Sequence, residues 1–128
     1  MTRIYLIITG IIGAALGTMI LFAPVAFYAG YGIEPAGQVN LLNELRSHGL
    51  SLLGAGLFIA SGAFLPRFGA LATVVAAGLY LSYGLSRLVA VALDGMPSSS
   101  LLLAAGVEIA IGLVGVALML RSPRAATA

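Results

Sequence analysis

The chain has 128 residues, of which 61% are hydrophobic and 8% charged, and its mean hydropathy is +1.13. Soluble proteins carry roughly 25% charged residues, so a soluble fold is excluded. The net charge of +2 comes from arginines alone, and it is too small and too dispersed to indicate nucleic-acid binding. No cysteine is present, which excludes thiol catalysis, disulfide exchange and cysteine-ligated metals.

Apolar stretches predict four membrane spans, because ~20 predominantly apolar residues suffice to cross a bilayer. We therefore predict an all-α fold, an integral membrane four-helix antiparallel bundle that forms one domain over residues 1–128. Short connections make consecutive helices antiparallel neighbours. The first stretch is longer than the 7–15-residue core of a signal peptide, so we interpret it as a span. The expected helices cover residues 4–27, 40–65, 68–93 and 100–120.

Charged loop residues predict the orientation. With four spans, the N-terminus, the link between the second and third helices, and the C-terminus lie on one side. That side carries all the loop arginines, and the other side's loops carry acids only. Because cytoplasmic loops are rich in Lys and Arg, both termini are expected in the cytoplasm. The residues concerned are Arg3, Arg67, Arg121 and Arg124 on one side, and Glu34 and Asp94 on the other.

Small residues predict where helices touch, since they allow backbones to approach closely in lipid. Gly13 and Gly17 form a G-x-x-x-G spacing in the first helix, and further glycines recur in the second and fourth helices. Packing within the chain is the simpler interpretation. A homodimer seam is the alternative.

Ionisable side chains within the apolar stretches are the candidate functional residues. A charge at mid-bilayer costs at least ~2.5 kcal/mol, so such residues usually face a bundle interior. With a rise of 1.5 Å per residue, Arg87 and Glu108 lie about 10 and 12 Å below the outer surface, and His48 lies at a similar depth. Three helices thus place polar groups in one layer. The candidate ligand-binding residues are Glu44, Arg46, His48, Tyr80, Tyr83, Arg87 and Glu108.

Each candidate also has a simpler interpretation. Glu44 lies in the first turns of its helix, where an acidic side chain is stabilised by the helix dipole. Arg46 lies about 200° around the helix from Glu44, so it can face another neighbour or the surface. Arg87 and Glu108 can be a structural pair that locks two helices. His48 can be a hydrogen-bonded packing residue, and the tyrosines can also be packing residues. We expect no metal and no cofactor.

The balance of charge favours a site. Glu44, Asp94 and Glu108 exceed Arg46 and Arg87 by one negative charge. A protonated His48, a bound proton or a cationic ligand could neutralise it.

Three motifs support a family resemblance. They are N-E-x-R-x-x-G at residues 43–49, G-x-x-R at residues 84–87, and Glu108. With them, the chain resembles, over nearly its full length, a bacterial domain-of-unknown-function family within the DoxX-like group of four-helix membrane proteins. The resemblance implies a multi-pass protein of the bacterial inner membrane and supports the charged residues of these motifs as a site. DoxX relatives are associated with membrane oxidoreductase assemblies and quinone-linked chemistry, but thiol redox chemistry does not carry over to a chain without cysteine.

Two functions follow as hypotheses. In the first, an outer-leaflet polar site between the second, third and fourth helices binds or passes a small amphiphile, a lipid head group or a proton. In the second, the chain is an accessory or structural subunit of a larger membrane complex. Membrane lipid is the expected partner, with a homo-oligomer as a further option. An enzyme is less favoured. Glu44 with His48 could act as an acid/base pair, but no other residue identifies a reaction.

Overall fold

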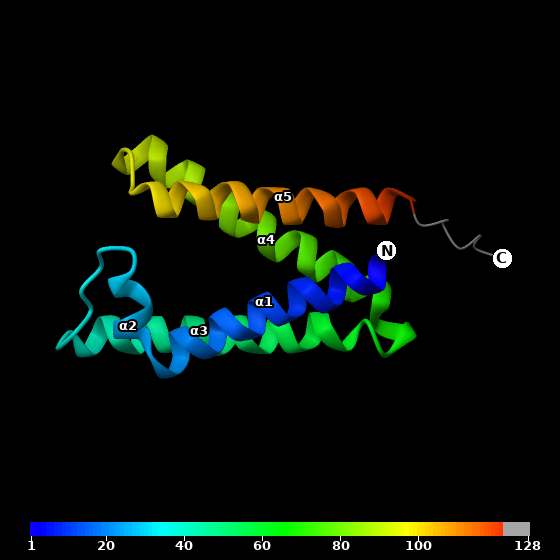
Figure 1. The fold of residues 1–128 in the computed structure, drawn as a ribbon, viewed down its shortest axis with the longest axis horizontal. Coiled ribbons are helices and arrows are strands. Elements are labelled where there is room, and N and C mark those ends of the chain that lie inside the picture. The colour runs from blue at the N-terminus through cyan, green and yellow to red at the C-terminus, as the bar shows by residue number, and fades with distance from the viewer. Residues whose placement is uncertain (122–128) are drawn as a thin grey trace.

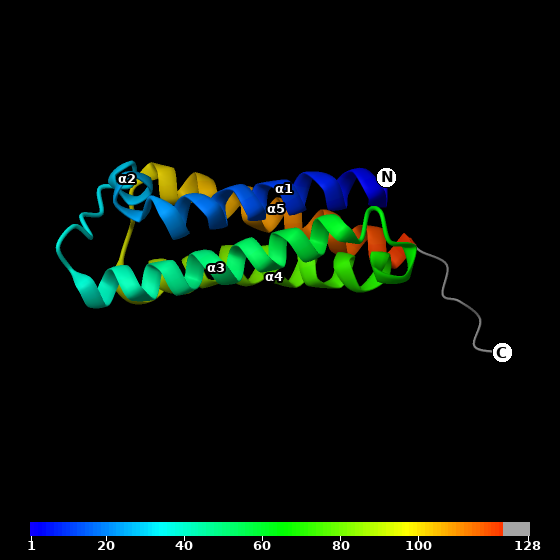
Figure 2. The same cartoon turned by 90° about the horizontal axis from the view of Figure 1, so that it is seen from below.

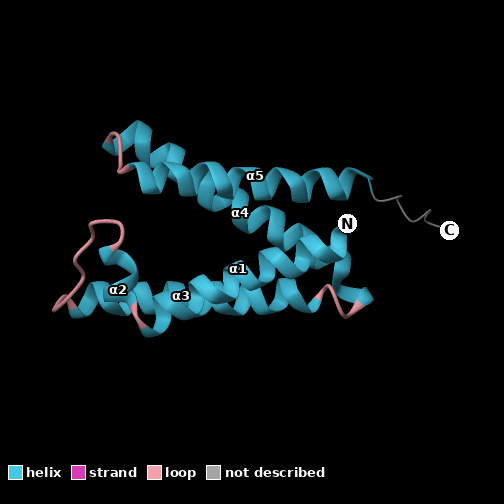
Figure 3. Ribbon diagram, viewed as in Figure 1, coloured by secondary structure: helices cyan, strands magenta, loops and turns pink. Residues whose placement is uncertain are grey.

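The structure, a computed structural model, describes residues 1–121, and these residues form helices joined by short loops (Figures 1 and 3). Residues 1–121 contain no β-strand, so the predicted all-helical class is confirmed. The helices are α1 (Thr2–Phe22), α2 (Pro24–Ala29), α3 (Val39–Ser61), α4 (Pro66–Asp94) and α5 (Ser99–Arg121).

Three helices, α1, α4 and α5, are long and apolar enough to cross a membrane, which indicates a membrane protein. The sequence predicted four such stretches. The fourth, residues 40–65, forms the 23-residue helix α3, which is long enough but carries Asn40, Glu44, Arg46 and His48 in its first half. Three of the four predicted spans are therefore confirmed as long and apolar enough to cross a membrane. The polar residues of α3 explain why the fourth stretch is less apolar than the others.

The first predicted helix, residues 4–27, is interrupted in the structure. Pro24 has no backbone N–H and cannot continue the hydrogen-bond ladder of α1. The helix ends at Phe22, Ala23 adopts φ −133° and ψ 52°, and the short helix α2 then starts in a new direction. The break frees the Leu21 carbonyl, and the Arg46 guanidinium donates a hydrogen bond to it. Arg46 thus caps the C-terminal end of α1, where the helix dipole favours a cation.

The long helices form two pairs. Helix α1 packs along α3, and α4 packs along α5, as Figure 1 shows. The pairs meet closely at one end, where the fully buried Leu6 and Ile59 lie in a core with Tyr5, Ala72 and Ala76. Toward the other end the α1–α3 pair and α5 diverge (Figure 1). Figure 2, seen from below, shows α1 overlying α5 and α3 overlying α4.

The arginines of the predicted cytoplasmic set gather at one end of the molecule. The N-terminus, the α3–α4 connection and the end of α5 lie there, and α2 and the α4–α5 connection lie at the opposite end (Figures 1 and 2). The Arg3 guanidinium stacks 5.5 Å from the centre of the Phe64 ring, which ties the N-terminus to the α3–α4 connection. Arg124, also predicted for this end, lies outside the described residues.

Glycines set the closeness of the α1–α3 pair. A Cβ atom added at Gly13 would lie 3.2 Å from the Gly56 Cα, and one added at Gly10 would lie 2.5 Å from the Ala60 nitrogen. In lipid, helix association depends on such close packing because lipid tails are as apolar as the side chains. The predicted contacts at Gly13 and Gly17 are therefore made within the chain, against α3.

Substitutions at two glycines of α3 should separate packing from helix propensity. A Cβ at Gly56 would lie 2.7 Å from the Gly13 carbonyl carbon, whereas a Cβ at Gly54 would meet nothing within 4 Å. We expect Gly56→Ala to lower the free energy of unfolding by ~1–3 kcal/mol through overpacking. Gly54→Ala should be neutral or stabilising by up to ~1 kcal/mol, because alanine favours the helix. Thermal unfolding in mild detergent measures both, and equal losses would contradict the glycine contact.

Candidate functional site

A cavity of ≈ 730 Å³ lies between the two helix pairs, on the side toward α2. Its volume falls within the roughly 300–1,000 Å³ of small-molecule sites. Aliphatic side chains of α1, α3, α4 and α5 form much of its wall, among them Ile12, Leu16 and Ile111. Polar side chains gather in one part of it. They include His48, Tyr80, Tyr83, Arg87 and Glu108, five of the seven residues predicted for the site.

The Arg87–Glu108 ion pair joins α4 to α5 in the cavity wall. Arg87 Nε donates to Glu108 Oε2 at 2.8 Å, and Arg87 Nη2 donates to Glu108 Oε1 at 3.0 Å. The predicted pairing is confirmed, and it is bidentate. Such fork-to-fork pairing fixes both the orientation and the depth of the two side chains. The side chains keep 31% and 18% of their surface exposed, so the pair lines the cavity without being sealed in the core.

His48 joins this polar layer through Tyr83. The Tyr83 hydroxyl lies 3.1 Å from Nδ1 and 3.0 Å from Nε2 of the imidazole, and the two rings meet edge to face at 5.4 Å. The hydroxyl can donate to the unprotonated ring nitrogen. This contact links α3 to α4, two helices that otherwise touch mainly near their connection (Figure 1).

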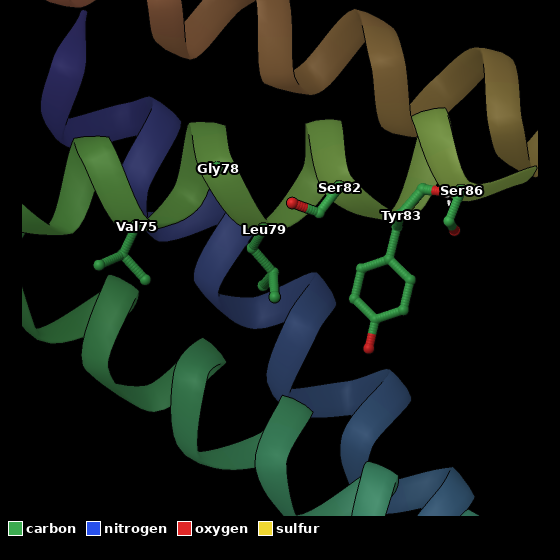
Figure 4. A pocket seen from close by; sticks show the side chains of 6 residues that line it. All are labelled: Val75, Gly78, Leu79, Ser82, Tyr83 and Ser86. Atoms are coloured by element: carbon green, nitrogen blue, oxygen red, sulfur yellow. Dashed lines mark hydrogen bonds between the residues drawn. The ribbon is translucent and has the colours of Figure 1, made fainter. Parts of the chain in front are cut away.

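Tyr83 also lines a second hollow. Figure 4 shows its side chain extending from α4 among the residues that line a groove of ≈ 480 Å³. Small and apolar residues line this groove, and Leu79, Tyr83 and Ser86 line both hollows. The Ser86 hydroxyl donates to the Tyr83 carbonyl at 2.8 Å, so it is satisfied within α4.

Tyr80 has a different role from Tyr83. It is only 5% exposed, and its hydroxyl donates to the Thr9 carbonyl of α1 at 2.6 Å. Tyr5 makes a comparable bond from α1 to the Ile111 carbonyl of α5, at 3.2 Å. The two tyrosines tie α1 to the α4–α5 pair, so Tyr80 closes the deep end of the cavity as a structural contact.

Glu44 and Arg46 do not line the cavity. Glu44 is exposed, about 140° around α3 from Gly49, which lies against α1. The ring nitrogens of His48 contact the Tyr83 hydroxyl, so within residues 1–121 the structure pairs His48 with Tyr83 and not with Glu44, the partner that the less favoured enzyme hypothesis would need. Arg46 caps α1 as described above.

The charge balance changes accordingly. Asp94 is exposed at the end of α4 and does not line the cavity either. The predicted surplus of one negative charge is therefore absent from the lining of the cavity. Within the described lining, Arg87 and Glu108 cancel. Among residues 1–121, no group of three or more His, Asp or Glu side chains could hold a metal ion.

Residues 1–119 match the family model described as Domain of unknown function (DUF4345). The chain belongs to this family. The expectation of an uncharacterised domain family is confirmed, and its link to the DoxX-like group stays a prediction. No curated protein and no solved structure matches the chain.

The sequence reasoning missed an aromatic group at the mouth of the cavity. The group consists of Phe27, Tyr28 and Tyr31, from α2 and the turn after it. The ring centres of Tyr28 and Tyr31 lie 5.1 and 5.5 Å from that of Phe27. Gly32, at φ 74°, allows the chain to turn back, and Ile33 donates to the Tyr28 carbonyl at 3.1 Å. Aromatic residues such as tyrosine are enriched where a membrane meets water. The presence of three aromatic residues shortly after Pro24 was the sequence signal that could have identified this group.

The ion pair should show strong coupling. Removing one partner of a buried pair costs ~3–5 kcal/mol, whereas replacing both is often nearly neutral. Because the Arg87 side chain is 31% exposed, we expect Arg87→Leu to cost about 3 kcal/mol, the lower end of that range. Arg87→Leu combined with Glu108→Leu should restore much of the loss. Melting temperatures in detergent measure the cycle, and additive losses would show that the two side chains act independently.

Proposed function

We propose that the protein is a multi-pass four-helix bundle of the bacterial inner membrane that binds a small amphiphile in the cavity between its helix pairs. The observation that carries this proposal is the composition of the cavity wall. A bidentate ion pair and a His–Tyr contact face a space otherwise lined mainly by aliphatic and aromatic side chains. Binding sites for small molecules combine an apolar lining with a few convergent polar groups in this way.

The proposed orientation places α2 and the mouth of the cavity in the outer leaflet. It rests on the end of the molecule that carries Arg3, Arg67 and Arg121, because basic residues remain on the cytoplasmic side. Helix α3 would then cross the membrane with its polar half toward the outer surface, its Arg46 bonded to α1 and its His48 to Tyr83.

A reporter test follows for the orientation. A reporter active only in the cytoplasm should give signal when fused after Arg121, and a periplasmic reporter should give signal when inserted at Pro35. A periplasmic signal from the Arg121 fusion would invert the proposed topology.

A second function, an accessory subunit of a larger membrane complex, is supported by unused small-residue surfaces. A Cβ atom added at Gly54, Gly78 or Gly106 would meet nothing within 4 Å, so these glycines leave helix faces open. Gly78 also lines the groove beside Tyr83. Membership of the DoxX-like group, proposed from the motifs, agrees with such a role.

Filling the cavity should separate the two functions. Ala104 lines the cavity on α5, and Ala110 on the same helix is exposed and does not. We expect Ala104→Phe to reduce retention of a co-purified small molecule at least ~10-fold, with a melting temperature that is unchanged or higher, because the ring occupies the space of the ligand. Native mass spectrometry in mild detergent measures the retention.

Ala110→Phe is the matched control and should retain the ligand. A wild-type protein that carries no small molecule but co-purifies stoichiometrically with another membrane protein would favour the subunit function instead.

A further inference from the structure

The charge of the cavity restricts its ligand. Among the residues that line it, Arg87 and Glu108 carry opposite charges and neutralise each other through two hydrogen bonds. A ligand with a net charge would therefore bring an uncompensated charge into a low-dielectric space, which is costly. An uncharged head group avoids that cost.

The ion pair still offers hydrogen bonds to such a head group. Arg87 uses Nε and Nη2 for Glu108, and its Nη1 makes no hydrogen bond within residues 1–121. A guanidinium has five N–H donors, and each carboxylate oxygen has room for a second donor. The pair therefore presents donors and acceptors side by side. A head group that combines hydroxyl and ester oxygens, each able to accept and the hydroxyls also able to donate, matches this arrangement.

The cavity also reaches an exposed aliphatic surface of the helices. Helices α1 and α5 are tied at the deep end by the Tyr5–Ile111 bond, and they diverge from there toward α2 (Figure 1). On α5, Leu103 and Val107 line the cavity while remaining 70% and 50% exposed. On α1, Ile12 and Leu16 line it as well. Because these four side chains are aliphatic, the gap between α1 and α5 suits an acyl chain that slides in from the bilayer.

We propose that the cavity takes an uncharged acylglycerol-type lipid, with the head group at Arg87–Glu108 and the acyl chain passing between α1 and α5. This inference rests on the proposed binding function and names its ligand class and its route of entry.

Three probes with the same 18-carbon chain test the ligand class: 1-oleoylglycerol, which is uncharged, oleyl sulfate, a permanent anion, and oleyltrimethylammonium, a permanent cation. Native mass spectrometry of the full chain in mild non-ionic detergent measures the occupancy by each probe at equal concentration. We expect one bound oleoylglycerol per chain and at least ~10-fold weaker binding of both charged probes.

The possible results distinguish the ligand class from the function itself. Equal or tighter binding of a charged probe would overturn the uncharged ligand and leave the binding function intact. No binding of any probe, in a protein that also carries no small molecule, would overturn both. Glu108→Gln leaves the cavity with one positive charge and should shift the preference toward oleyl sulfate. The wild-type series is decisive even if this variant does not fold.

A second experiment tests the route. Val107→Trp places a large ring at the gap between α1 and α5, and Leu113→Trp places the same ring at a 56% exposed position on α5 outside the cavity lining. Exchange of bound oleoylglycerol for an isotope-labelled copy in lipid nanodiscs is followed by native mass spectrometry. We expect Val107→Trp to slow the exchange several-fold and Leu113→Trp to leave it unchanged. Equal exchange rates in the two variants would overturn the lateral route.

Discussion

Close backbone contact within each helix pair is the constraint on which the rest of the structure depends. Gly13 meets Gly56 between α1 and α3, and a Cβ atom at Gly84 of α4 would lie 3.2 Å from the Ala105 carbonyl of α5. In a membrane, where burial of apolar surface does not drive helices together, such contacts supply the packing energy. Between the pairs, by contrast, the contacts are made by side chains, and the Tyr5 and Tyr80 hydroxyls join α1 to the α4–α5 pair at one end. Tight contact within each pair, together with the divergence of the pairs toward α2, leaves the cavity (Figure 1).

The polar groups of the molecule are arranged to avoid unpaired charge in lipid. Arg87 and Glu108 satisfy each other across α4 and α5. Arg46 is bonded to the backbone where Pro24 interrupts α1, so the two irregular features compensate each other. No buried side-chain nitrogen or oxygen within residues 1–121 lacks a hydrogen-bond partner. Pairing of this kind is expected of intramembrane charges whether or not they also bind a ligand. The functional proposal therefore depends on the space beside the pair.

That space gives the proposed site two distinct ends. At the deep end, Tyr80 and Tyr5 are fixed by bonds to backbone carbonyls and act as struts. At the mouth, the aromatic residues of α2 and its turn face the cavity from a segment with two positive-φ glycines, Gly32 and Gly37. The ion pair lies on the wall between these ends. A ligand with a polar head and an apolar tail can contact both the ion pair and the aliphatic wall, whereas a uniformly polar ligand would leave the aliphatic wall uncovered.

The sequence by itself determined the helical class, three of the four predicted spans, the clustering of arginines at one end, and the pairing of Arg87 with Glu108. These properties depend on composition, on the 3.6-residue period and on the rise per residue, all of which are local. Only the tertiary structure decided that His48 faces the cavity and Glu44 does not. Both lie four residues apart on α3, and the sequence assigned them to one face.

The physical reason is that which part of a helix surface is buried depends on its neighbour. The α3 face at Gly49, Leu52, Gly56 and Ile59 is covered by α1, which turns His48 toward Tyr83 and Glu44 outward. The divergence of the two helix pairs, and with it the cavity, depends likewise on which side chains meet between them. The spacing of residues along one helix does not indicate which side chains of the two helix pairs contact each other.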